Sequence, residues 1–409
     1  MRRKGPWHSW RSELPTGPES EMTCGVDHAR RREIATEEAD LRGQVRAFLR
    51  DQLDSGSFVP RCDAWLAGFS PEFSRELGLR GWIGLTIPRK YGGHERSALS
   101  RYVVIEELLA AGAPVAAHWF ADRQFAPSLL AYGTERQKLK YLPAIAGGEC
   151  FFAIGMSEAD AGSDLAGLRT KAARTTDGWR LTGSKLWTSG AHHAHAIVVL
   201  ARTTPHSDGE SRHEGLSQFI VDLPANGVQI NPIRLLTGEH HFNEVVFDDV
   251  YVNDEQVLGS VGEGWRQVTA ELAYERSGPE RYLSTFPLLE ILVRRVDRVE
   301  DSRNIVGVIG GLLARAWTLR QLSYEIASAL ADGDSPEIEA AMVKDLGTTF
   351  EQDLADVLLN AIEMPADLRS ADPLQRALAE AVLHSPGYTI RGGTNEVLRG
   401  VVAKSLGLR

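Results

Sequence analysis

Cysteine is scarce in this chain, and that scarcity limits the possible folds. The only cysteines are Cys24, Cys62 and Cys150, which show no CxxC spacing and leave an odd one unpaired. A disulfide framework or a zinc ribbon is therefore excluded, and a reduced compartment is indicated. Long hydrophobic runs are also missing, because Glu106 and Glu107 interrupt the longest one, well short of the ~20 residues of a spanning helix. We expect a cytoplasmic protein that does not enter a membrane.

The sequence also has no excess of positive charge. It contains 45 Lys and Arg against 55 Asp and Glu, a net charge of −10, so nothing in its charge favours nucleic acid or anionic lipid as a partner. What it does have is material for a large core. Its 409 residues, 43% of them hydrophobic, are enough for two to four structural units of ~100–200 residues each. A single small binding module is excluded.

The period of the apolar residues changes twice along the chain. Residues 1–30 are rich in Arg, Ser, Pro and Gly without a period and are expected to form a mobile tail, with Met22 as a candidate start. Residues 31–150 show helical spacing. Short β-branched runs separated by Gly, Pro and Asp mark 151–262, and the helical period returns in 263–409. This order predicts an α+β fold with two helical domains around a β domain.

Local signals place some helix starts in the first helical region. Ser70 before Pro71, and Ser100, look like helix N-termini. Thr134 followed by Gln137 fits a capping box, in which each side chain bonds to the other residue's backbone N–H.

Six motifs then follow one another in order over nearly the whole chain. They are GWIGLTIPRKYGG (81–93), YLP with GGE (141–143, 147–149), MSEADAGSD (156–164), GSKLWTS (183–189), FDDV with VLG (247–250, 257–259) and GGTNE (392–396). In this order the chain resembles the acyl-CoA dehydrogenase family from about residue 35 to 409. The resemblance implies an N-terminal helical domain, a middle β domain and a C-terminal four-helix bundle. It also implies tetramers that hold FAD between subunits and act in fatty acid or lipid degradation.

Two middle motifs contain the residues that would hold FAD. Taken alone, the glycines and hydroxyls of the first motif suit a phosphate or flavin edge, but also suit a plain turn between strands. Trp187 alone is more often a core residue than a cofactor stack. The resemblance favours cofactor binding for both motifs. In the first motif it implies that Met156 and Ser157 line the flavin with Gly162 nearby, and that Ser163 reaches FAD or acyl-CoA phosphates. In the second it implies that Trp187 covers the flavin ring and that Thr188 and Ser189 contact its N5 and O4.

The C-terminal half contributes further FAD contacts by resemblance. Thr394 and Glu396 occupy positions that contact FAD in relatives, although the residues alone read as a plain helix start. Arg303 corresponds to an arginine that reaches the FAD pyrophosphate of an adjacent subunit, with Val306 in place of the family's Phe.

The family's chemistry is α,β-desaturation of an acyl-CoA thioester, which needs a carboxylate base while the β-hydride leaves for flavin N5. Many members carry this base as a Glu where this chain has Gly392. A branch that includes isovaleryl-CoA and long-chain dehydrogenases places it on the first helix after the β domain, after a Gly-x-Gly. That position is Glu275 here, which otherwise reads as an exposed helical Glu beside an Arg.

The residues around the proposed base would contact the substrate. By resemblance Arg276 faces the phosphate side of the acyl-CoA, although a surface role is nearly as compatible with its position. Gly392 and Gly393 would let the main chain approach the thioester, where a backbone N–H polarises the carbonyl. Gly278-Pro279 should break or kink the helix soon after the base.

One family motif is missing. The Gln-x-x-Gly-Gly-x-Gly stretch that wraps a neighbour's FAD does not occur in residues 350–385. Some bacterial relatives that act on steroid side chains form α2β2 heterotetramers with a shared flavin site, so both a homotetramer and a heterotetramer with a related chain stay open, as does a subunit with an incomplete FAD site.

A flavin monooxygenase of the same fold is a third interpretation, but such relatives typically lack the base that Glu275 would provide. Electrons of a dehydrogenase would leave through an electron-transferring flavoprotein.

Histidines gather in two places without a metal motif. His192, His193 and His195 form one group and His240-His241 the other. Adjacent histidines on a strand point to opposite sides, and no Cys or HExxH spacing supports them. We predict no metal.

Overall fold

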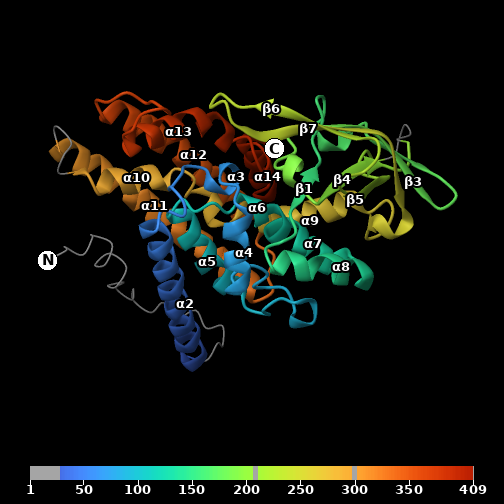
Figure 1. The fold of residues 1–409 in the computed structure, drawn as a ribbon, viewed down its shortest axis with the longest axis horizontal. Coiled ribbons are helices and arrows are strands. Elements are labelled where there is room, and N and C mark those ends of the chain that lie inside the picture. Colours follow the sequence, from blue (N-terminus) through green and yellow to red (C-terminus); the bar gives the residue numbers. More distant parts are fainter. Residues whose placement is uncertain (1–27, 206–210, 297–301, 409) are drawn as a thin grey trace.

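The computed structural model describes residues 28–205, 211–296 and 302–408, with the side chains of 28–35, 271–275 and 302–304 left out. Most of the expected N-terminal tail, residues 1–27, therefore lies outside the described residues. Figure 1 shows a helical N-terminal region, a twisted sheet at one end of the molecule and long C-terminal helices along the other side. This order of helical, β and helical regions confirms the predicted fold class.

The N-terminal region is built from short helices around α2 and α5, which pack against each other. Ser70 caps α4 by accepting a hydrogen bond from the Phe73 N–H at 3.2 Å, and Thr134 and Gln137 form the predicted capping box of α8. The expected start at Ser100 is wrong, because Ser97 caps α5 and Ser100 is buried inside it. The helices are α2 (His28–Asp54), α3 (Ala64–Ala67), α4 (Pro71–Leu79), α5 (Ala98–Ala110), α6 (Ala116–Phe120), the π-helical η2 (Ala121–Phe125), α7 (Ala126–Tyr132) and α8 (Glu135–Ala146).

The middle region is one mixed sheet. Its strands run in the order β6-β7-β3-β2-β4-β5-β8, and β1 pairs in parallel with β4. Alternating burial along β3 and β7 explains the β period of the sequence, since every second side chain enters the core under the sheet. The strands are β1 (Phe152–Gly155), β2 (Lys171–Arg174), β3 (Gly178–Lys185), β4 (Ala196–Arg202), β5 (Leu216–Asp222), β6 (Val228–Arg234), β7 (His240–Asn253) and β8 (Val257–Leu258).

The C-terminal region consists of helices that enclose α12. This helix packs against α9, α11, α13 and α14 and buries residues along most of its length, including Phe350 and Leu354. The first helix of this region, α9, ends at Arg276. It stops just before Gly278-Pro279, where the sequence predicts a break. The helices are α9 (Gly264–Arg276), α10 (Phe286–Val293), α11 (Ser302–Ala331), α12 (Glu337–Ala361), α13 (Pro373–Tyr388) and α14 (Asn395–Ser405).

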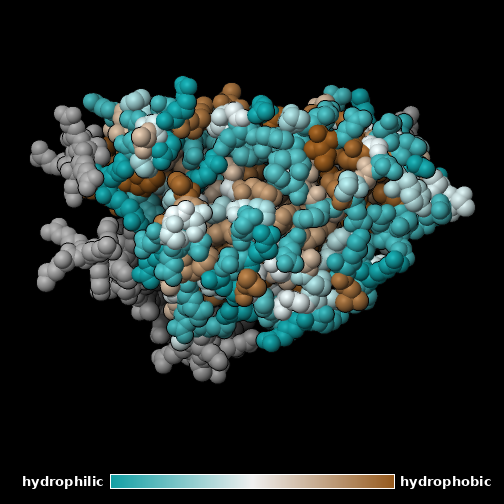
Figure 2. All heavy atoms as spheres, viewed as in Figure 1, coloured by the Kyte–Doolittle hydropathy of each residue, from teal (hydrophilic) through white to brown (hydrophobic). Residues whose placement is uncertain are grey.

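The cores link these regions into one body. The largest cluster joins α2 and α5 to α10, α11, α12 and α13, so the two helical regions share one hydrophobic interior. A second cluster seats α7 and α8 against β1, β4 and β5. The visible surface in Figure 2 is mostly hydrophilic, with separate hydrophobic groups between polar side chains. Among the described helices, each is too short or too polar to cross a bilayer.

The second cluster allows a stability test with a matched control on α8. Leu142 is fully buried in it, whereas Leu139, three residues earlier on the same helix, is 59% exposed. Leu142→Ala should lower the free energy of unfolding by about 2–5 kcal/mol, because it removes buried methyl groups and leaves a cavity. Leu139→Ala should change it by less than about 0.5 kcal/mol. Denaturant unfolding of both variants measures these changes. Equal losses of unfolding free energy would contradict the position of α8.

Candidate active site

The loop after β3 presents an aromatic wall. Trp187 has a left-handed backbone with φ of 58°, is 55% exposed, and meets the ring of Phe242 edge-on at 5.8 Å between centroids. Asn243 fixes the next residue, since the Thr188 N–H donates to the Asn243 carbonyl at 3.0 Å and the Asn243 amide donates back to the Thr188 carbonyl at 2.9 Å. The buried Thr188 hydroxyl has no hydrogen-bond partner among the described residues. This wall combines an open aromatic face with an unused hydroxyl.

The loop after β1 lies beside the strand that leads to this wall. Met156 and Ser157 are half-buried, and their carbonyls accept hydrogen bonds from Lys185 Nζ at 3.0 Å and from the Leu186 N–H at 2.8 Å. Burial lowers the pKa of Lys185 to about 8, although Glu158 pairs with it at 2.8 Å. Gly162 and Ser163 lie further along the same loop and are exposed. The start of this loop is therefore held beside β3 by hydrogen bonds, whereas its later part is open to solvent.

A glycine turn before α14 forms a second wall. Gly392 and Gly393 have φ of 69° and 87°, a left-handed backbone that favours glycine. Arg276 at the end of α9 donates from Nε to the Gly392 carbonyl at 3.3 Å. Thr394 caps α14 by accepting from the Val397 N–H at 3.4 Å, and Glu396 is exposed in its first turn. The structure thus brings Arg276 against the turn formed by the two glycines.

A buried arginine occupies the space beside the turn. A Cβ added at Gly392 would lie 2.8 Å from Nη2 of Arg281, whose side chain is almost fully buried. Sequence reasoning missed this residue, although it stands only six positions after Glu275. Any side chain at position 392 would have to displace this guanidinium group and adopt a φ of 69°, which gives a physical reason for glycine there.

The proposed base stands on α9 and Arg303 stands on α11. The side chains of both lie outside the described part of the structure, so their roles stay predictions.

An ion pair closes the N-terminal side of the turn. Asp63, buried and left-handed at φ 56°, accepts from Arg391 Nη1 at 2.6 and 2.7 Å. Burial raises the pKa of the Asp63 carboxyl, but Arg391 and His384 outweigh it and hold that pKa well below its usual value. Arg391 also donates to the Ser284 hydroxyl at 2.9 Å and lies over the ring of Trp65. No motif points to this pair, which joins residues 328 positions apart.

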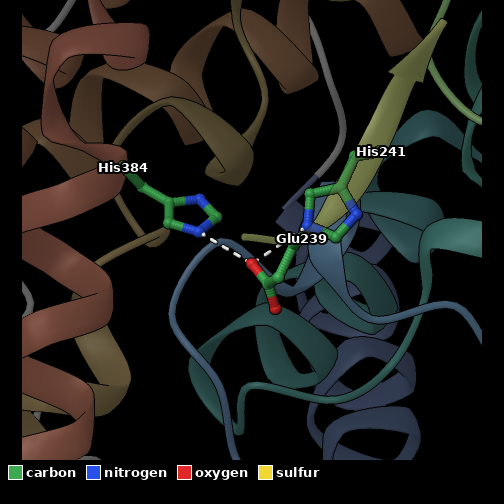
Figure 3. A group of neighbouring side chains, drawn as sticks. All are labelled: Glu239, His241 and His384. Carbon is green, nitrogen blue, oxygen red and sulfur yellow. Dashed lines mark hydrogen bonds and ion pairs between the residues drawn. The ribbon is translucent and has the colours of Figure 1, made fainter. Parts of the chain in front are cut away.

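A histidine continues the ion pair towards the sheet. His384 Nδ1 lies 3.0 Å from Asp63 Oδ2, and its Nε2 lies 3.2 Å from Glu239 Oε2, which also bonds His241 Nε2 at 3.1 Å (Figure 3). Burial lowers the pKa of His384, but its two carboxylate partners raise it to about 9. The ring is therefore an imidazolium at neutral pH, with both N–H groups donating.

Three side chains of this cluster also lie close enough to share an ion. The ligand atoms of Glu239, His241 and His384 lie within 4.8 Å of one another. His384 bonds Asp63 through Nδ1 and Glu239 through Nε2, so the hydrogen bonds give the more direct account of this residue. Arg61 also pairs with Glu239. We interpret the cluster as an ion network.

The other histidines have partners within the protein. The rings of His192 and His240 stack at 3.9 Å, and the side chain of Asn243 bonds both of them. His195 Nδ1 accepts from the Phe151 N–H at 3.0 Å. A polar loop, the expectation for these histidines, is wrong for His240 and His241, because they begin β7 and this strand pairs with β6. His192 and His193 lie in the short 3-10 helix η4 (Ala191–His193).

A small cavity, lined by apolar and polar residues, lies beyond the end of α9. Its volume is about 20 Å³, room for about one water molecule. One wall contains a buried ion pair, Arg123 to Glu280, at 2.6 Å. A Cβ at Gly278 would lie 2.1 Å from the Glu280 carboxylate, so glycine is required where the chain leaves α9. The lining residues are Ala98, Arg101, Tyr102, Arg123, Ser277, Gly278, Ser323, Ala327 and Leu330.

The glycine turn can be tested by adding one methyl group. Gly392→Ala should destabilise the protein by about 1–3 kcal/mol, because alanine is strained at φ 69° and its Cβ meets Arg281. Gly400→Ala on α14 is the matched control: its Cβ would meet nothing within 4 Å, so the substitution should be neutral or stabilising by up to about 1 kcal/mol. Thermal melting of both variants compares them, and equal melting temperatures would contradict the crowded turn.

Comparison with known proteins agrees with this architecture. Three family models match in order: the N-terminal domain of acyl-CoA dehydrogenase over 35–149, its middle domain over 153–250 and its C-terminal domain over 289–407.

Relatives are found among curated proteins and solved structures. Acyl-CoA dehydrogenase IpdE1 of Mycobacterium tuberculosis is 34% identical over 89% of this chain and 96% of its own. Acyl-CoA dehydrogenase FadE34 of the same organism is 33% identical over 82% of this chain, which spans only about half (46%) of FadE34. The Tcur3481-Tcur3483 steroid ACAD structure has a TM-score of 0.80 and 29% identity, covering 91% of this chain and 98% of its own. The ChsE4-ChsE5 complex from M. tuberculosis has 0.77 and 30%, covering 95% and 99%. The chain belongs to the acyl-CoA dehydrogenase family.

Proposed function

We propose that this acyl-CoA dehydrogenase desaturates an acyl-CoA thioester, with Glu275 taking the α-proton and FAD accepting the β-hydride. The observation that carries the proposal is the hydrogen bond from Arg276 Nε to the Gly392 carbonyl. This bond holds the last turn of α9 against the position where many relatives carry their base. The backbone of Glu275, one residue before Arg276, therefore lies next to the turn that would bind the thioester.

The aromatic wall fits a flavin ring. Trp187 offers an exposed face, and the buried Thr188 hydroxyl has an unused hydrogen-bonding capacity that a ring oxygen or nitrogen would satisfy. Ser189, half-buried beside it, adds a second hydroxyl. When bound, FAD would supply the hydride acceptor. Met156, Ser157, Gly162 and Ser163 would line the same cofactor on the side of β1, and Arg303, Thr394 and Glu396 on the side of the C-terminal helices.

Positive charge surrounds the turn that would bind the thioester. Burial, together with the nearby Arg281, Arg391 and Arg276, lowers the pKa of Lys344 to about 7, since each of these disfavours a further positive charge. Removing an α-proton places negative charge on the thioester oxygen. Backbone N–H groups of Gly392 and Gly393, in this positive field, would stabilise that charge.

Replacing the proposed base tests the assignment. In the flavin-loaded enzyme, Glu275→Gln should leave a folded, yellow protein whose flavin is no longer bleached by acyl-CoA, a loss of at least about 100-fold in the reduction rate. Glu263→Gln at the start of the same helix is the control, because that carboxylate is exposed and pairs with Arg266. Anaerobic titration with a panel of branched, long and steroid-derived acyl-CoAs, followed by flavin absorbance, measures both. Unchanged bleaching in Glu275→Gln would reject the assignment.

A second proposal concerns assembly. Two of the similar structures are named as pairs of chains, Tcur3481-Tcur3483 and ChsE4-ChsE5. The family's FAD-wrapping motif is absent from residues 350–385, which form parts of α12 and α13 and the segment between them. Both α12 and α14 also leave large apolar side chains exposed: Met342, Leu346, Val397 and Val401. We propose a heterotetramer in which a related chain completes the FAD site, in preference to a homotetramer. Reduced enzyme would pass electrons to an electron-transferring flavoprotein.

Co-expression tests this assembly. The chain purified alone should be colourless or contain less than half its FAD, because one side of the cofactor site would be missing. Co-expressed with a related acyl-CoA dehydrogenase chain from its gene neighbourhood, it should purify as a yellow complex of about four chains in light scattering. A fully yellow homotetramer of this chain alone would contradict the proposal.

A further inference from the structure

The two walls of the proposed site come from different parts of the chain. The aromatic wall around Trp187 follows β3, whereas the glycine turn precedes α14. A substrate placed between them reacts only if both walls keep their separation, because a misplacement of about 1 Å can cost about 100-fold in rate. Something in the protein must therefore connect the two walls.

The start of β7 holds the aromatic wall. Asn243 exchanges two hydrogen bonds with Thr188, and the Gly190 N–H donates to the His241 carbonyl at 2.9 Å. Asn243 is completely buried, so these bonds are shielded from water. The backbone of residues 241–243 and the loop of residues 187–190 therefore move as one unit.

Side chains next to this segment lead to the glycine turn. Glu239, directly before β7, bonds His384 Nε2 (Figure 3). His384 Nδ1 bonds Asp63, and Asp63 binds Arg391, the residue immediately before Gly392. We propose that His384 and Asp63 are positioning residues that fix the aromatic wall and the glycine turn relative to each other. This inference rests on the proposed function.

Burial makes the connection stiff. The side chains of His384 and Asp63 are 3% and 2% exposed, so their hydrogen bonds are shielded from water, and breaking one would leave a buried charge with one partner fewer. Asp63 also keeps a left-handed backbone that a non-glycine residue adopts only when its surroundings enforce it.

Charges from every neighbouring element face His384. Asp63 comes from the N-terminal region, Glu239 and His241 from the strand end, Glu380 from its own helix and Arg391 from the turn; Arg61 and Glu351 lie one contact further away. The positive ring lies between two carboxylates. Deprotonation of His384 would remove one N–H donor. Either Asp63 or Glu239 would then lose its hydrogen bond to the ring.

The pH dependence has a definite sign. The pKa of His384 is raised from 6.5 to about 9 in the folded protein. Its contribution to stability is therefore fully present below about pH 6.5 and is lost as pH rises through about 9. If the ring positions the two walls, the rate of flavin reduction should fall over the same alkaline range.

The experiment compares pH profiles of flavin reduction in the flavin-loaded enzyme. Wild type should lose rate above about pH 9. His384→Gln should be slower by about tenfold at pH 7, without that alkaline loss, and its KM for acyl-CoA should change less than threefold, because positioning affects the reacting geometry more than binding. His213→Gln, an exposed histidine stacked on Trp265, is the control and should match wild type.

A second variant separates charge from shape. Asp63→Asn keeps the size of the side chain, and asparagine tolerates a left-handed backbone. It should slow the reaction similarly and move the alkaline loss to lower pH, because His384 would lose one anionic partner. If His384→Gln reduces flavin as fast as wild type, or keeps the loss above pH 9, the proposal is overturned. Failure of the proposed function would look different, since then no acyl-CoA would bleach even the wild type.

Discussion

The ion pair between Asp63 and Arg391 is the constraint on which the site depends. It joins a loop of the N-terminal region to the last turn before α14, and its two bonds of 2.6 and 2.7 Å are shielded from water. A planar guanidinium held by one carboxylate has little freedom to rotate, so the backbone that follows it is directed as well. The glycine turn takes its place in the molecule from this pair rather than from its own sequence, since two adjacent glycines have no intrinsic preference for one conformation.

The interior around this pair is unusually rich in charge. Burial raises the pKa of the Glu351 carboxyl to about 7, although Arg391 lies 3.8 Å from it. Arg123 and Glu280 form another pair that is almost completely buried. Such pairs contribute little net stability, because desolvation opposes their attraction, but each is costly to break. Their value is geometric: they specify one arrangement of helices where hydrophobic contacts alone would permit several.

Much of the fold follows from the sequence, and the reason is local. Helix period, β period, the cap at Ser70 and the box at Thr134 depend on residues within one or two turns, so they can be predicted. The start of α5 was misplaced by three residues because Ser97 and Ser100 carry the same capping chemistry and packing decides between them. Motif order predicts the walls of the proposed site, including Trp187 and Gly392. By contrast, Arg281, His384 and Asp63 take their roles from contacts across hundreds of residues, which no pattern in one sequence encodes.

The crowding of Gly392 by Arg281 has a consequence for how this family diversifies. Relatives differ in which of two places carries the proton-abstracting group, and the two arrangements look interchangeable on paper. Here position 392 lies against the Arg281 guanidinium group and has a left-handed backbone, so a side chain introduced there would have to displace the arginine and strain the turn. A single substitution is therefore not enough to move the proposed base to position 392, and the surroundings of Arg281 would have to change with it.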